Sequence, residues 1–269
     1  MSSIKHPLED VSNISHLLNL PYCEFLSCFG HFSMHPGGLD QTINLMEDAG
    51  LNDSDRVLEI GCGTGLTSQM LHESRIEVHL LEPNIRLLQS TLNLCAQSIP
   101  KKVPFYLTQI EDISKVPKAH FTMAIMEAVF GFVGDKDLAL RNIKKLLTGE
   151  DQRLAVIDFC YHTAPPKTVI TEFKKLVGID LQIFFQHDWE QLFKKNHFDF
   201  EKFVPFALPP INSPKPGEIK SMLEANNLIQ FFPEATEEHL RLCSDRWKVF
   251  NDLFDENKKY LYGFRAVVS

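Results

Sequence analysis

A glycine-rich loop near residue 60 constrains the fold of this chain more than any other part of its sequence. It reads Glu59-Ile60-Gly61-Cys62-Gly63-Thr64-Gly65 and follows a short apolar run that begins after Arg56. Alternating glycines let the chain turn tightly and let a ligand approach the backbone, while the free N–H groups of a helix predicted from Leu66 point into the same space. The pattern is typical of a nucleotide-like ligand held between a strand and a helix.

Apolar strand-like segments alternate with helix-like segments after this loop, which is the sequence sign of β–α units on a parallel sheet. Leu154-Ala155-Val156-Ile157 is continuously apolar, as expected for a strand covered on both faces. Helices are expected from Leu66, from Pro83 and over 135–147. The five expected parallel strands are 56–60, 78–81, 104–107, 121–126 and 154–159.

Helical segments are expected on either side of this core. Before it, residues 11–28 have a helical pattern, 29–38 form an aromatic- and glycine-rich loop, and 39–49 form a further helix. After it we expect, in order, helices at 167–177 and 188–195, a strand at 198–204 and a proline-rich break at 205–216. Two helical stretches, one of them over 234–258, and a strand at 260–268 should follow. We divide the chain into an N-terminal helical lid (1–38), a core (39–204 and 259–269) and a helical insertion (205–258).

A carboxylate ends the second expected strand, about 20 residues beyond the glycine loop, where Glu82 can accept two hydrogen bonds from a ribose diol. The structural alternative is a plain turn, with Glu82 capping the helix that begins at Pro83. The functional alternative is a dinucleotide oxidoreductase. Its GxGxxG fingerprint would place the third glycine at position 66, which is Leu66, so the GxGxG spacing disfavours NAD or FAD.

The segment 57–65 resembles the first motif of the class I S-adenosylmethionine-dependent methyltransferases. Three later segments agree in order with the family's ribose-binding, adenine-binding and fourth-strand segments: Leu80-Leu81-Glu82-Pro83-Asn84, Leu107-Thr108-Gln109-Ile110-Glu111-Asp112 and Ala124-Ile125-Met126-Glu127-Ala128-Val129. In many members an Asp occupies the position of Gln109. The resemblance implies an α/β, Rossmann-like, seven-stranded sheet that is mostly parallel with an antiparallel last strand and has helices on both faces.

The same resemblance implies S-adenosyl-L-methionine as the cofactor. The residues that it assigns to cofactor binding are Glu59, Gly61, Cys62, Gly63, Gly65, Glu82, Pro83, Gln109, Ile110, Glu111 and Met126. A narrower similarity, to small-molecule N-methyltransferases of the phosphoethanolamine type, rests on the segments 34–38 and 157–160. Where that subfamily grips phosphate with basic and tyrosine side chains, this chain has the segment 176–181 and Phe159, so we do not expect phosphoethanolamine as the substrate.

Methyl transfer from a sulfonium is an in-line displacement that needs no covalent nucleophile, only an aligned acceptor and the exclusion of water. A general base helps when the acceptor is a protonated amine or a hydroxyl. The candidate catalytic residues are His35, Glu127, Asp158 and His162. Asp158 equally fits a structural cap, and Glu127 equally fits support of the glycine loop. His31 and His35 are four residues apart, but the surrounding glycines and proline argue against a helix, and no metal site is expected there.

Composition narrows the class of acceptor and the compartment. A net charge of −8 leaves no overall attraction for nucleic acid or anionic lipid. Six cysteines without CxxC pairs fit a reducing cytoplasm, and neither a signal pattern nor a run of about 18 apolar residues indicates a membrane segment. We expect a cytoplasmic enzyme that methylates nitrogen or oxygen of a small molecule. A catalytically silent methyltransferase-like protein that binds cofactor or a partner, and a protein methyltransferase, remain the alternatives.

Overall fold

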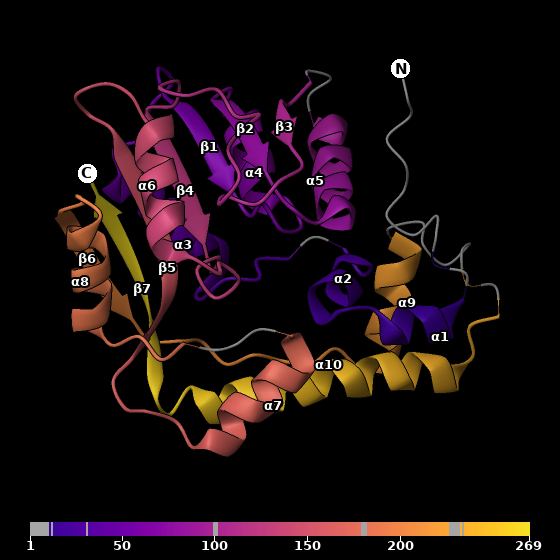
Figure 1. The fold of residues 1–269 in the computed structure, drawn as a ribbon. Helices are drawn as coiled ribbons and strands as arrows, with labels where there is room; N and C mark the ends of the chain where they lie inside the picture. Colours follow the sequence, from indigo (N-terminus) through magenta and orange to yellow (C-terminus); the bar gives the residue numbers. More distant parts are fainter. Residues whose placement is uncertain are drawn as a thin grey trace.

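A seven-stranded sheet with the order β3-β2-β1-β4-β5-β7-β6 forms the centre of the molecule (Figure 1). The computed structural model describes residues 11, 13–30, 32–98, 102–178, 182–225, 232 and 234–269. The strands are β1 (Arg56–Ile60), β2 (Glu77–Leu81), β3 (Phe105–Tyr106), β4 (Met123–Glu127), β5 (Arg153–Tyr161), β6 (Phe200–Phe206) and β7 (Leu261–Val268). Strands β1 to β5 are parallel, and β7 is antiparallel to both of its neighbours. This arrangement confirms the fold expected from the sequence.

Helices cover both faces of the sheet, because successive apolar residues of its central strands point to opposite sides. In β5, Leu154 and Val156 join one core while Ala155 and Ile157 join the other. The first core also contains side chains of α6 (Lys136–Leu146) and α8 (Gln186–Lys195). The second core contains side chains of α3 (Gly38–Asp48), α4 (Leu66–Glu73) and α5 (Ile85–Ser98).

The remaining helices form a cap on the sheet. They are α1 (Ile14–Asn19), α2 (Tyr22–Ser27), α7 (Lys167–Val177), α9 (Pro216–Ala225) and α10 (Glu237–Asn257). Apolar side chains of α1, α2, α9 and α10 share one core, although the two helix pairs are almost 200 residues apart in the chain. Helix α7 packs on α10 through Val169, Phe173 and Phe254. Figure 1 shows α10 as the long gold helix along the lower edge of the view.

The division into lid, core and insertion stays a prediction, and residues 1–10, 12, 31, 99–101, 179–181, 226–231 and 233 of it lie outside the described residues. One expected element is wrong: residues 11–28 form two short helices instead of one. Leu20 ends α1 with an extended backbone and Pro21, which has no N–H to donate, precedes α2. Strand β6 also begins two residues later than expected, after the Phe198 N–H closes the turn behind α8 onto the Phe193 carbonyl.

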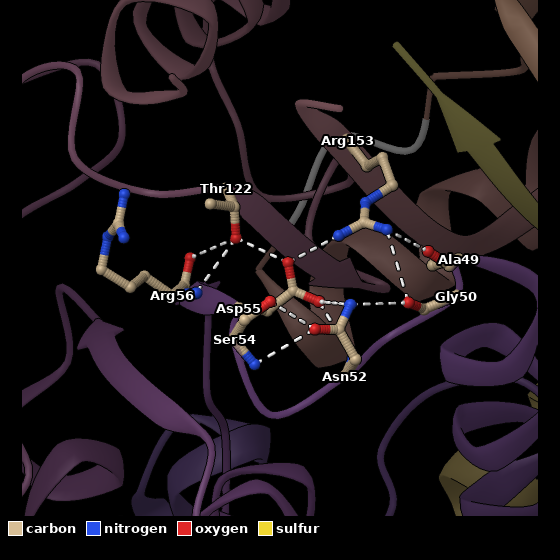
Figure 2. Close-up of polar contacts among 8 residues, drawn as sticks. All are labelled: Ala49, Gly50, Asn52, Ser54, Asp55, Arg56, Thr122 and Arg153. Carbon is tan, nitrogen blue, oxygen red and sulfur yellow. Dashed lines mark hydrogen bonds and ion pairs between the residues drawn. The ribbon is translucent and has the colours of Figure 1, made fainter. Parts of the chain in front are cut away.

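An ion pair between the partly buried Arg153 and the buried Asp55 joins the strands at the end of the sheet where β1, β4 and β5 begin (Figure 2). Nη2 of Arg153 lies 2.6 Å from Oδ1 of Asp55, and the Thr122 hydroxyl donates to the same oxygen at 2.7 Å. Nη1 of Arg153 donates to the carbonyl of Ala49 at the end of α3. The network therefore fixes three strands and one helix relative to one another. In the part of the chain that the structure describes, no helix is both long and apolar enough to span a membrane.

Candidate functional site

The glycine loop follows β1 and leads into α4. All three of its glycines, Gly61, Gly63 and Gly65, have positive φ. A Cβ on Gly61 would lie 2.6 Å from the Val129 side chain, and one on Gly65 would lie 2.8 Å from the backbone of Thr91. Gly63 has a different neighbour, since its Cβ would lie 3.1 Å from the methyl group of Met34. Packing thus requires the outer two glycines, whereas Gly63 faces the segment that crosses above the loop.

Glu82 lies directly after β2 and is only 4% exposed. Its Oε1 accepts the Asn84 N–H at 2.9 Å, and its carboxyl also accepts the backbone N–H of Gly63. Burial raises the pKa of Glu82 to about 7. Asn84 caps α5, because its Oδ1 accepts the N–H groups of Arg86 and Leu87. Glu82 therefore contacts the glycine loop, and Asn84 rather than Glu82 is the N-terminal capping residue of α5.

Two further acidic side chains lie at the ends of the neighbouring strands: Glu59 is the penultimate residue of β1, and Glu127 is the last residue of β4. The carboxyl of Glu59 accepts the Ser68 hydroxyl of α4 at 2.5 Å. Burial raises the pKa of Glu59 to about 8, and the nearby Glu127 and Glu82 add to the effect. Three acidic groups in one buried region favour a ligand that carries positive charge and disfavour an anion.

The structure brings His35 and Glu127 together through Thr42. Both side chains are less than 10% exposed, and Nε2 of His35 lies 3.6 Å from Oε1 of Glu127. The Thr42 hydroxyl donates to Oε1 at 2.6 Å and lies 3.0 Å from Nε2 of His35, so its oxygen is free to accept the Nε2 proton. Thr67 of α4 donates to the other carboxyl oxygen of Glu127 at 2.6 Å. These contacts form a buried chain that can hold and pass a proton.

The other two candidate catalytic residues lie apart from this chain. Asp158 is buried and accepts the N–H groups of Phe130 and Phe159, so it ties the loop after β4 to β5. Burial raises the pKa of Asp158 to about 7. His162 is exposed, and its ring contacts the hydroxyl of Thr163. Among the described residues, no hydrogen bond or ion pair joins either side chain to His35 or Glu127.

The segment expected to hold adenine lies between β3 and β4. Asn142 of α6 donates to the carbonyls of Ile110 and Glu111, both at 3.0 Å. The Glu111 carboxyl accepts the Gly134 N–H at 2.9 Å, so this side chain braces the loop before α6. Ile110 is buried, whereas Gln109 is exposed. The remaining sequence-predicted residues are Cys62 and Met126, which are buried, and Pro83, which is exposed.

Polar contacts fasten the cap to the glycine loop. The Thr64 hydroxyl donates to the carbonyl of Phe32 at 2.6 Å and accepts its N–H at 2.9 Å. Glu24 of α2 accepts hydrogen bonds from Asn84 and Arg86, each at 2.9 Å. Figure 1 shows α2 between α5 and α10. The segment that contains Met34 and His35 is thereby held over the glycine loop.

Sequence reasoning missed Thr42, Thr67 and Glu24 as parts of this site. Thr67 had a usable signal, because it lies in the first turn of the helix that follows the glycine loop. Thr42 and Glu24 had none, since each meets its partner across at least 60 residues of chain. Their contacts depend on how α2 and α3 dock on the sheet.

Comparison with known proteins agrees with this geometry. Residues 58–150 match a family model described as a methyltransferase domain. The uncharacterized methyltransferase YodH of Bacillus subtilis is 27% identical over 111 residues, which are 41% of this chain and 47% of YodH. The chain thus matches about half of the length of that curated relative.

Two solved structures have a similar fold. Phosphoethanolamine N-methyltransferase 2 of Haemonchus contortus, in complex with phosphomonomethylethanolamine and S-adenosylhomocysteine, has a TM-score of 0.67 and 15% identity, covering 100% of this chain and 60% of that chain. The [4+2]-cyclase SpnF has a TM-score of 0.58 and 14% identity, covering 85% of this chain and 79% of that chain. Residues 58–150 of this chain thus match a methyltransferase domain, and the whole chain has the fold of class I S-adenosylmethionine-dependent methyltransferases.

Proposed function

We propose that this protein transfers a methyl group from S-adenosylmethionine to a nitrogen or oxygen atom of a small molecule. The observation that carries the proposal is the glycine loop with Glu82 and two further buried acidic groups at the ends of adjacent parallel strands. This is the edge of an open α/β sheet at which ligands bind. The match of residues 58–150 to a methyltransferase domain and the likeness to methyltransferase structures support it.

S-adenosylmethionine combines a ribose diol, an adenine ring and two cationic groups, and it supplies an electrophilic methyl group. Glu82 would accept hydrogen bonds from the diol, and the backbone N–H groups of the glycine loop would point at the ligand. Buried Ile110 offers an apolar contact for adenine. Glu59 and Glu127 would stabilise the cationic end of the cofactor, because opposite charges attract strongly in a buried site.

For the acceptor, we propose His35 as the general base. The Thr42 hydroxyl donates its proton to Glu127, so the Nε2–H of His35 donates to Thr42. Nδ1 is then the atom that would take up a proton, and the Pro36 carbonyl oxygen, 3.3 Å away, could accept a hydrogen bond from the protonated Nδ1. Glu127 would stabilise the positive charge that His35 gains on taking a proton from an ammonium or a hydroxyl. Thr42 and Glu127 therefore act through His35 as positioning residues.

A small acceptor fits the enclosure of this region. The cap core packs Phe25, Phe29 and Phe32 around Trp247 of α10, with ring centroids between 5.3 and 6.5 Å apart. Arg246 donates to the carbonyls of Leu17, Leu18 and Leu20, which binds α1 to α10. A methyl acceptor the size of a metabolite would reach the site with less displacement of this cap than a folded protein.

The test is the formation of S-adenosylhomocysteine from S-adenosylmethionine with a metabolite library and, separately, a peptide library. Turnover with a small amine or hydroxyl compound, lost in Glu82→Ala, supports the proposal. Methylation of peptides alone would favour a protein methyltransferase. Cofactor binding without turnover in either library would favour the catalytically silent alternative or a reaction other than methyl transfer, since a [4+2]-cyclase has a similar fold.

The role of His35 has its own measurement. His35→Gln should lower kcat by about 100-fold or more, in line with the usual contribution of a general base, and should leave the KM for S-adenosylmethionine within about threefold. Thr42→Val should lower kcat less than His35→Gln does, because it removes the hydroxyl that joins His35 to Glu127. An unchanged kcat in His35→Gln would exclude His35 as the base.

A further inference from the structure

A second cluster of ionisable side chains lies away from the glycine loop, near the start of β2. Glu77 is the first residue of β2, His79 is the third, and His120 lies just before β4. Nε2 of His79 is 3.3 Å and Nε2 of His120 is 3.4 Å from Oε1 of Glu77. One ligand atom from each of the three residues lies within 4.8 Å of the other two.

These separations suit a tetrahedral metal ion. With Zn–N and Zn–O bonds of about 2.0–2.2 Å, two ligand atoms at the tetrahedral angle lie roughly 3.4 Å apart. Both carboxylate–imidazole distances already have this value. Both are also longer than the most common N–H···O hydrogen bond of about 2.9–3.0 Å. Only a small approach of the two histidine rings would complete three corners of the tetrahedron.

The hydrogen bonds of the two imidazoles leave one nitrogen of each ring able to bind a metal ion. Nδ1 of His79 lies 3.0 Å from the hydroxyl oxygen of Tyr106, so a proton on Nδ1 leaves the lone pair of Nε2 directed at the cluster. Nε2 of His120 is buried and has no hydrogen-bond partner among the described residues.

The backbone of the cluster is well held. Nε of Arg56 donates to the carbonyl of His120 at 2.6 Å, and the rings of His79 and His120 both pack edge-on against Phe121. The Glu77 side chain is 49% exposed, which gives an ion a route from solvent. Two neutral imidazoles and one carboxylate are the donor set preferred by zinc and similar transition metals, whereas magnesium and calcium take oxygen ligands.

We propose that Glu77, His79 and His120 bind one Zn²⁺ or a chemically similar divalent transition-metal ion, with water as the fourth ligand. The ion would cross-link β2 to the segment before β4. The site lies where these strands begin, at the end of the sheet opposite the glycine loop. Its role is structural, and it does not depend on methyl transfer.

The experiment is calorimetric titration of the full chain with Zn²⁺ at pH 7.5, after treatment with a chelator and in a reductant that does not bind metal. The wild-type chain should bind one equivalent. Glu77→Gln and His120→Gln should each weaken this binding by about 100-fold or more, and Tyr106→Phe by about tenfold, since loss of a supporting partner costs roughly 10–100-fold. Co²⁺ in the same site should give the strong visible absorption of tetrahedral cobalt.

The matched control is His187→Gln. His187 lies 3.2 Å from the carboxyl of Asp188, so it is another histidine–carboxylate pair, and it lies outside the cluster. Its removal should leave the Zn²⁺ affinity unchanged. The proposal is overturned if the wild-type chain does not bind Zn²⁺, or if the folded Glu77→Gln and His120→Gln variants bind it as tightly as the wild type, as zinc held by cysteines would.

Discussion

Three buried carboxyl groups make the stability of this protein depend on pH. Burial raises the pKa of Glu59 to about 8 and of Glu82 and Asp158 to about 7. A raised pKa means that the folded chain binds more protons than the unfolded chain above about pH 4.5, so the stabilising contribution of these groups is lost as the pH rises through 7 to 8. Free energy of unfolding in the ligand-free protein is thus sensitive to mild alkali.

Glu59→Gln tests this sensitivity. The amide is always neutral and can still accept the Ser68 hydroxyl, so the variant avoids burying a charge at high pH. Between pH 6 and pH 9 the Tm of the wild type should fall further than the Tm of Glu59→Gln. Scanning calorimetry across this range measures both, and two parallel curves would show that Glu59 does not titrate there.

Glu82→Ala tests the ribose contact. The variant should bind S-adenosylhomocysteine more weakly by about 1.5–3 kcal/mol, because it removes charge-assisted hydrogen bonds. That loss corresponds to roughly 10- to 150-fold in Kd. Titration calorimetry provides the measurement, and Asp137→Asn, at a partly exposed carboxyl on α6, provides the control. Equal affinity in a folded Glu82→Ala variant would remove this residue from the cofactor site.

Local residues of the site could be read from the sequence because their role depends on local backbone geometry. Gly61, Gly63 and Gly65 all adopt the positive φ that their spacing predicts. The contacts from His35 through Thr42 to Glu127 could not be predicted this way, since they join a loop, a helix and a strand, and Thr42 and Glu127 are 85 residues apart. His162 has a side chain that could act as a base, but it is exposed, and only the tertiary structure reveals this position.

At the scale of the elements, the contact between the cap and the glycine loop can be tested directly. Thr64 satisfies both the N–H and the carbonyl of Phe32. Thr64→Val should weaken this contact by about 1–3 kcal/mol, because two backbone groups lose a partner. Hydrogen exchange at residues 32–38 should become faster, while exchange in β4 and β5 should not change.

Thr64→Ser is the matched control, since it keeps the hydroxyl and removes only a methyl group. It should keep slow exchange at residues 32–38 and near-normal affinity for S-adenosylhomocysteine. If Thr64→Val also exchanges slowly at these residues, other contacts such as those of Glu24 hold the cap in place.

The elements themselves were predictable where periodicity is strong. Expected helix 135–147 and α6 agree within one residue at each end, and the apolar run 154–157 lies inside β5. The break between α1 and α2 was missed because the apolar pattern continues across Pro21 while its backbone cannot. Strand order beyond β5 depended on the family resemblance, because pairing between distant strands leaves no local pattern.

At the scale of the whole molecule, the Asp55–Arg153 pair of Figure 2 should contribute to stability and have no role in ligand binding. Arg153→Met leaves the buried Asp55 carboxyl without its cation and should destabilise the fold by about 3–5 kcal/mol. Urea denaturation measures the loss. Lys195→Met breaks the more exposed pair with Asp137 and should cost less than about 1 kcal/mol.

Both variants should retain wild-type affinity for S-adenosylhomocysteine at a temperature where they are folded, because neither pair contacts the glycine loop. If Arg153→Met instead weakened ligand binding while its stability stayed near wild type, the network would be coupled to the site through β1 and β4. The comparison therefore separates support of the fold from support of the site.

The position of β7 between β5 and β6 affects how the chain is made as well as how it is held. Until residues 261–268 leave the ribosome, β5 keeps one open edge and β6 has no partner in the sheet. At about 5–20 residues per second, this interval lasts for seconds of translation. Open strand edges pair readily with other chains. Newly made copies of this protein should therefore depend on chaperones until β7 has been made and has paired with β5 and β6.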